Sequence, residues 1–218
     1  MIKEPREGYF KFTPHFVGEF VFQPSILDEL NRWRERLFAI QLIGMYREGE
    51  LKGVGYGNIS VRTAGGFVIT ATRTGGLEKL GPQHYTEIVG VDLERNTVEF
   101  RAESPAITPS AECMTHAAFY QAAPSIGAVI HVHQLDFWRR LLNHVPTTAP
   151  EVAYGTTEMA HEFIRLYRET DLPSRKLAAM AGHEEGIISF GRDLDEAGNV
   201  LLEAWEKSVG SGQWGRGQ

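Results

Sequence analysis

The segment from Ala128 to His133 places two histidines within an apolar run. Successive side chains of a β-strand point to opposite faces, so His131 and His133 share one face while Ile130 and Val132 share the other. The apolar pair can enter a core, which leaves two imidazoles about 7 Å apart along the strand. Because both nitrogens of a buried imidazole need partners, this pair suits a divalent metal. Two ordinary histidines at the end of a strand are the competing interpretation.

The size and composition of the chain are those of an ordinary soluble protein. With 218 residues, 42% hydrophobic and 23% charged, it can bury the core of one α/β domain. The formal net charge of −6 argues against nucleic acid or an anionic membrane as a partner. No signal-peptide pattern and no run that could span a bilayer are seen. Cys113 is the only cysteine, so no internal disulfide can form, and we expect a cytoplasmic protein.

We expect three segments along the chain. Residues 1–24 mix proline, glycine and aromatic residues without a helical period, which indicates an extended arm. Residues 25–209 are predicted to form the folded domain, and residues 210–218 have the composition of a flexible tail. Short strand patterns alternate with helical ones, which indicates an α/β fold with a central, mostly antiparallel sheet flanked by helices.

Local signals place the elements of this domain. A helix is expected to begin at Ser25 and to fade by Gly53. A second helix should begin near Pro109 and carry Glu112 in its first turns. The remaining patterns predict helices at about 157–170 and around 200–205, hairpins of 59–62 with 67–70 and of 88–93 with 98–100, and strands near 128–133, 177–181 and 186–190.

Two further residues could complete a metal site. A catalytic zinc needs about three protein ligands and one open position, and His131 with His133 supplies two of them. The best candidate for the third is His183, in a segment where flanking glycines permit a tight turn. Glu112 near the start of a helix gains from the helix dipole, and it could either ligate the metal or carry a proton.

The motifs of the chain occur in an order that is typical of one known family. The chain resembles the class II aldolase/adducin superfamily, and in particular its fuculose-phosphate aldolases, over roughly residues 30–205. The motifs that carry this resemblance are Gly57-Asn58-Ile59-Ser60, Thr74-Gly75, Pro109-Ser110-Ala111-Glu112, His131-Val132-His133, Tyr154-Gly155-Thr156 and the late His183.

The resemblance implies a function and a site. Members of the superfamily have a three-layer α/β fold and are commonly homotetramers with sites at subunit interfaces. By resemblance, His131, His133 and His183 would ligate Zn²⁺, although Mn²⁺, Co²⁺ or Fe²⁺ suit the same donors. Glu112 would act as the acid/base of the reaction. A glycine-rich turn and a helix start favour an anion, and the family's phosphate-binding positions correspond here to Asn58, Thr74, Gly75 and Ser110.

The chain departs from the family pattern in three places. Ala111 replaces a second hydroxyl residue before the glutamate, which makes a non-phosphorylated substrate credible. Residues 135–153 contain no tyrosine, although fuculose-phosphate aldolases have their catalytic tyrosine there. The third histidine is followed by Glu184 and Glu185, which form either a solvated turn or an added carboxylate beside the metal. We favour the solvated turn.

The leading hypothesis is a divalent-metal-dependent lyase of the class II aldolase type, which cleaves a small hydroxy-carbonyl substrate through a metal-stabilised enediolate. A dehydratase, an epimerase or a decarboxylase would share that chemistry. A non-enzymatic binding module of the adducin-head type is the main alternative from another class, since such relatives keep the fold without the reaction. A cupin site also begins with His-x-His, but its glutamate follows the histidines on an all-β barrel.

Overall fold

An eight-stranded sheet forms the centre of the protein, which the computed structural model describes for residues 11–210. All neighbouring strands are antiparallel except the first pair, β1 with β7, which is parallel. The expected α/β fold with a mostly antiparallel sheet is therefore confirmed. The strands lie in the order β1 (Thr13–Glu19), β7 (Thr97–Ala102), β6 (Tyr85–Asp92), β5 (Gly66–Thr70), β4 (Asn58–Thr63), β8 (Ala128–His133), β10 (Gly186–Gly191) and β9 (Leu177–Ala179).

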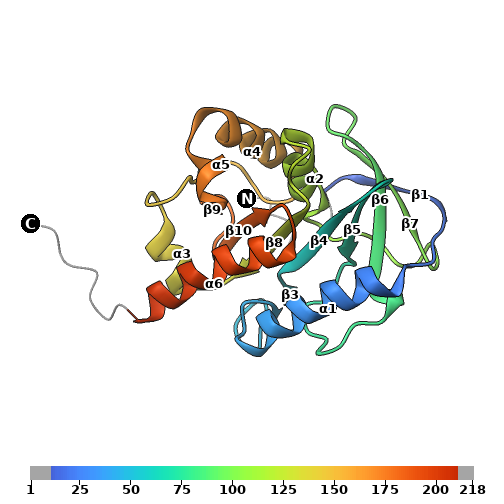
Figure 1. Ribbon diagram of the computed structural model, residues 1–218, viewed down its shortest axis with the longest axis horizontal. Helices are drawn as coiled ribbons and strands as arrows, with labels where there is room; N and C mark the ends of the chain where they lie inside the picture. Colours follow the sequence, from blue (N-terminus) through green and yellow to red (C-terminus); the bar gives the residue numbers. More distant parts are fainter. Residues whose placement is uncertain (1–10, 211–218) are drawn as a thin grey trace, which may run out of the picture.

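Helices cover both faces of the sheet and make a three-layer structure (Figure 1). Because β8 is central and fully buried, its alternating side chains divide between two cores: Ile130 and Val132 enter one, and Val129 enters the other. The first core is completed by α1 (Pro24–Ala39), α3 (Leu135–Leu141) and α6 (Leu194–Gly210), and the second by α2 (Cys113–Ala122), α4 (Thr157–Glu169) and α5 (Leu172–Arg175).

The first helix is shorter than the sequence predicts. It begins with Pro24, which fits the first helical position because no amide hydrogen is needed there, so the predicted start at Ser25 is wrong by one residue. It ends at Ala39 because Gln41 adopts a left-handed conformation with φ 60°, and the amide of Leu42 bonds the carbonyl of Leu37. Glycine usually marks such a stop, so a glutamine there leaves no signal in the sequence.

A short ribbon of two strands follows, where the sequence predicts the end of the helix. It consists of β2 (Gly44–Met45) and β3 (Gly55–Tyr56), which pair antiparallel. A 3₁₀ helix, η1 (Pro82–His84), lies later in the chain, between β5 and β6.

The second helix begins later than predicted. Pro109 forms an isolated antiparallel bridge with Ala71, and the carbonyl of Thr108 accepts from the amide of Thr72. These contacts hold the segment extended, so α2 starts only at Cys113 and Glu112 occupies the N-cap position instead of the first turn. The later start of α2 therefore sets the position of the Glu112 carboxylate.

The other predicted elements are confirmed with small shifts at their ends. Both hairpins form, as β4 with β5 and β6 with β7, and α4 begins where the side chain of Thr156 accepts from the amide of Met159. Within the expected N-terminal arm, residues 13–19 form the edge strand β1, while residues 1–10 lie outside the described part. The expected tail also lies outside it, apart from Gly210 at the end of α6. Between residues 11 and 210, none of the helices combines the length and the apolar character that a membrane span requires.

Candidate metal centre

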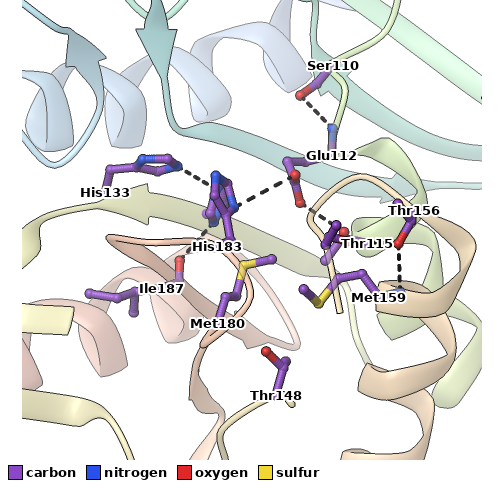
Figure 2. A network of polar contacts seen from close by, with 12 residues as sticks. Ser110, Glu112, Thr115, His133, Thr148, Thr156, Met159, Met180, His183 and Ile187 are labelled. Carbon is purple, nitrogen blue, oxygen red and sulfur yellow. Dashed lines mark hydrogen bonds and ion pairs between the residues drawn. The ribbon is translucent and has the colours of Figure 1, made fainter. Parts of the chain in front are cut away.

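Three buried histidines converge at one end of the central strand. His131 and His133 lie at the end of β8, and His183 lies in the turn between β9 and β10. One nitrogen of each ring lies within 4.8 Å of one nitrogen of the other two, and no side chain is more than 6% exposed. Figure 2 shows His133 and His183 close to each other, with Glu112 on the far side of His183.

Strand pairing explains why residues 50 positions apart meet here. His133 pairs with Gly186 in the register of β8 and β10, so the turn that precedes β10 lies beside the end of β8. The turn is closed by bonds between the backbone groups of Met180, His183 and Gly186. It also packs closely on residues 150–152, because a Cβ at Gly182 would lie 1.8 Å from the carbonyl oxygen of Val152. Only glycine fits at this position.

Hydrogen bonds determine which ring nitrogen carries the proton in His131 and in His133. Nδ1 of His131 lies 3.1 Å from the carbonyl oxygen of Ile187, which can only accept, so Nδ1 carries the ring proton. Nδ1 of His133 lies 2.9 Å from the hydroxyl of Tyr46, and this hydroxyl donates its one hydrogen to Glu185 Oε2 at 2.9 Å. The hydroxyl therefore accepts from His133, and both histidines have an unprotonated Nε2.

The two Nε2 atoms lie 2.9 Å apart. That separation suits a hydrogen bond, but neither nitrogen has a hydrogen to donate when both Nδ1 atoms carry the ring protons. Two lone pairs therefore face each other inside the protein, and a shared cation would resolve their repulsion. Neutral imidazole nitrogens are also the donors that zinc and related divalent metals prefer, so the residues present fit such an ion.

Burial keeps this pair neutral. Desolvation is the main cause that lowers the pKa of His131 and of His133 well below the ordinary value, and the nearby His183 adds to both shifts. A histidine must be deprotonated before it can ligate a metal, and these two rings are already neutral near neutral pH.

Glu112 places a buried carboxylate beside the third histidine. Its Oε1 lies 3.9 Å from Nδ1 of His183, and its Oε2 accepts a hydrogen bond from the hydroxyl of Thr115 at 2.9 Å (Figure 2). Its amide donates to Ser110 Oγ at 3.2 Å, which orders the segment just before α2. The carboxylate is thereby aimed at the histidines from the N-cap of the helix.

All eight site residues that the sequence predicts line one small cavity of about 50 Å³. Asn58 pairs with His131 in the register of β4 and β8, which places both side chains on the same face. The loop with Thr74 and Gly75 and the segment with Ser110 close two further sides. The lining residues among the predicted ones are Asn58, Thr74, Gly75, Ser110, Glu112, His131, His133 and His183.

A buried arginine holds the loop that closes the cavity. Arg34 on α1 is 1% exposed, and its guanidinium donates to the carbonyl oxygens of Thr74, Gly75 and Glu78 at 2.9, 3.0 and 3.1 Å. Desolvation lowers the pKa of this guanidinium from its ordinary value. Sequence reasoning missed this residue, because its position on the helix gives no sign of its partners.

We expect Arg34→Met to lower the free energy of unfolding by about 2–4 kcal/mol, because several buried carbonyl groups would lose their donors. Urea unfolding measures the change. Arg32→Ala is the matched control on the same helix: its ion pair with Asp195 is more than half exposed, so its loss should cost less than about 1 kcal/mol. Equal losses for the two variants would contradict the role of Arg34.

Aromatic rings pack against the histidines. The ring of Tyr154 stacks on His183 with centroids 4.3 Å apart, and the ring of Tyr56 stacks on His133 at 5.5 Å. The Nζ of Lys11 also lies over the Tyr154 ring, 4.2 Å from its centroid. The sequence signalled Tyr154 through its motif, but it did not signal Tyr46, which lies in the segment mistaken for the end of a helix, or Tyr56, which lies beyond that segment.

Another buried histidine lies behind the site. Nδ1 of His116 on α2 is 2.7 Å from Ser60 Oγ, which is also 2.7 Å from the hydroxyl of Tyr120. Arg62 packs its guanidinium over the ring of Tyr120, 4.8 Å from the centroid. Burial lowers the pKa of His116 to about 3, so this side chain is neutral in the folded protein.

The folded protein should therefore lose stability in acid. Between pH 6.5 and about 3 the unfolded chain binds a proton at His116 that the folded chain does not, so stability falls as the pH falls through this window. The slope from this one group is roughly 1 kcal/mol per pH unit. In urea unfolding at several pH values, His116→Asn should show a shallower slope than the parent. A slope as steep in His116→Asn as in the parent would contradict the role of His116.

The fold and the cluster define an α/β protein with a three-histidine site of metal-binding type. The family described as Class II Aldolase and Adducin N-terminal domain matches residues 42–208, and the chain therefore belongs to this family.

Solved structures of this family share the fold. L-fuculose-1-phosphate aldolase from Thermus thermophilus is 21% identical, with a TM-score of 0.61 over 86% of this chain and 92% of that chain. YgbL from Escherichia coli, whose description gives aldolase, epimerase and decarboxylase as alternatives, is 21% identical, with a TM-score of 0.63 over 88% and 91%. A sugar-phosphate aldolase from Thermotoga maritima is 16% identical, with a TM-score of 0.60 over 89% and 97%.

Proposed function

We propose that this protein is a divalent-metal-dependent lyase of the class II aldolase type, which cleaves a carbon–carbon bond in a small hydroxy-carbonyl compound. One observation carries the proposal: the lone pairs of two buried, neutral histidines face each other beside a third histidine and a buried carboxylate. His131, His133 and His183 would hold the ion. Zinc is the first choice, and Mn²⁺, Co²⁺ or Fe²⁺ would suit the same nitrogen donors.

The side chains around the cavity can carry out the protein's part of such a reaction. The cation, when bound, would stabilise the negative charge that develops on the substrate as the bond breaks. Glu112 would exchange a proton with the substrate, since its Oε1 faces the histidines and its Oε2 is held by Thr115. Burial of the carboxylate and of all three histidines keeps bulk water away from the reacting atoms.

Other side chains that line the cavity would bind the far end of the substrate. Asn58, Thr74 and Ser110 offer polar side chains there, and Gly75 brings its backbone close. Ala111 also lines this cavity and offers no hydroxyl, which favours a substrate without phosphate. A dehydratase, an epimerase or a decarboxylase would use the same residues, as the alternative descriptions of YgbL illustrate.

We also propose that the protein is a homo-oligomer, with a tetramer as the first expectation. The side chains of Ile40 and Met45 are 39% and 44% exposed along a groove of about 960 Å³ that also reaches His133. A second copy could cover these apolar groups. Light scattering should give a particle of about four times the 24.4 kDa chain. A reducing compartment, such as the cytoplasm, suits the buried free thiol of Cys113.

The decisive test is the metal content of protein purified without a histidine tag or added metal. About one zinc or similar ion per chain is expected from a set of three histidines. A screen of hydroxy-carbonyl and hydroxy-acid compounds for cleavage would then define the reaction. If the purified protein contains no metal and also does not bind added zinc, the proposal is refuted and a binding module of the adducin-head type is favoured.

A further inference from the structure

Two side chains outside the three-histidine cluster form a chain of hydrogen bonds that ends at His133. The hydroxyl of Tyr46 lies between Nδ1 of His133 and Oε2 of Glu185, at 2.9 Å from each. The three side chains come from separate segments: the ribbon strand β2 is followed at once by Tyr46, while His133 ends β8 and Glu185 precedes β10. All three also line the groove of about 960 Å³ that opens beside the cavity.

The direction of these bonds determines what they do to the histidine. The carboxylate of Glu185 can only accept, so the hydroxyl hydrogen of Tyr46 points to it and the hydroxyl oxygen accepts from His133. The chain of bonds keeps the proton of His133 on Nδ1 and turns Nε2 toward the centre of the cluster. The negative charge of the carboxylate, passed on through the hydroxyl, makes that nitrogen a stronger donor to a cation.

The backbone around both residues is also fixed. Glu185 has a φ of 70°, a left-handed conformation that a glutamate adopts only at some cost in energy. Its carbonyl accepts from the amide of Gln134, the residue after His133, which ties the turn to the end of β8. The amide of Tyr46 donates to the carbonyl of Val54 across the ribbon. A residue kept in an unfavourable conformation, with its side chain bonded toward the cluster, indicates a use for the carboxylate.

We propose that Tyr46 and Glu185 are positioning residues of the metal centre, which hold His133 in its ligating orientation and strengthen its bond to the ion. This corrects the interpretation of Glu184 and Glu185 as a solvated turn: Glu184 is exposed, whereas Glu185 bonds to Tyr46. The inference rests on the proposed function, because it requires that the three histidines bind a cation. It assigns a role to Glu185, one of the two acidic residues that follow the third histidine.

The test compares metal affinity in variants that each change one functional group in this chain of bonds. Tyr46→Phe removes the hydroxyl, and Glu185→Gln removes the charge at constant size. Each should weaken the binding of zinc, measured by competition with a chromogenic chelator, by roughly 10- to 100-fold. The visible spectrum of the cobalt-loaded protein should shift, since its bands report the ligand environment of the ion.

Two controls match these variants closely. Glu184→Gln changes the exposed neighbour, and Tyr56→Phe removes a hydroxyl that donates to the carbonyl of Gln41 from a ring that also stacks on His133. Both should stay within about twofold of the parent in zinc affinity. Glu185→Gly separates the carboxylate from the backbone: it relieves the left-handed strain and should raise the melting temperature of the metal-free protein, yet it should weaken zinc binding as Glu185→Gln does.

The outcomes separate this inference from the proposed function. If the parent protein binds no zinc, the proposed function fails. If the parent binds zinc and both Tyr46→Phe and Glu185→Gln bind it equally well, the positioning role is refuted while the metal site stands. If Glu185→Gln loses the metal as completely as a histidine variant, Glu185 is itself a ligand and the positioning role is again refuted.

Discussion

Replacing His183 with alanine should reduce the bound metal from about one ion per chain to less than roughly a tenth of that, and should abolish activity. The variant leaves only the pair on β8, because the three histidines are the cluster that the described residues offer for an ion. Two neutral nitrogens cannot retain a divalent cation against dialysis as three can. Mass spectrometry of the purified protein measures the metal directly.

The control for this variant is a histidine outside the site. His161 on α4 is about half exposed and lies near Glu94, so His161→Ala should keep the full metal content. The metal-free His183→Ala variant should remain folded with a somewhat lower melting temperature than the metal-free parent, because it loses a buried ring that stacks on Tyr154. Full metal content in His183→Ala would remove this residue from the ligand set.

Glu112→Gln should lower the turnover number by roughly 10²- to 10⁴-fold while the metal stays bound. Glutamine has the shape of glutamate and its oxygen can still accept from Thr115, but it cannot take or return a proton. The Michaelis constant should change much less than the turnover number, because the lost contribution belongs to the transition state. Steady-state kinetics on the substrate found in the screen, together with the metal content, check both parts.

Either part of that result can fail separately. Turnover close to the parent's would show that another group carries the proton. Loss of the metal together with activity would make Glu112 a ligand whose main role is to hold the ion. Glu103→Gln, at an exposed position, should leave both quantities unchanged.

The residues that the structure brings together in the candidate site carry signals that can be read from the sequence. Alternation along β8 alone places His131 and His133 on one face, and the buried apolar partners on the other face are found as expected. The order of the motifs then indicated His183 and Glu112, which the structure brings to the same cavity. The hairpins and α4 were predictable for the same reason, since periodicity and caps operate over a few residues.

The contacts that support the site depend on the tertiary structure. The helix α1 ends at Ala39, before Gln41 in its left-handed conformation, and no local rule foretells that Tyr46 then lies next to His133. Glu185 looks like a residue of a solvated turn until the pairing of β10 with β8 brings it to Tyr46.

The sequence by itself determined the fold class and pointed to the residues of the candidate site, because strand alternation is a property of neighbouring residues and the motifs follow one another in a recognisable order along the chain. Tertiary structure alone decided how the site is supported: Arg34 beneath the loop at Thr74, and Tyr46 with Glu185 behind His133. These bonds join residues that are 40, 87 and 139 positions apart. Only the packing of helices and strands on one sheet brings such positions within hydrogen-bonding distance.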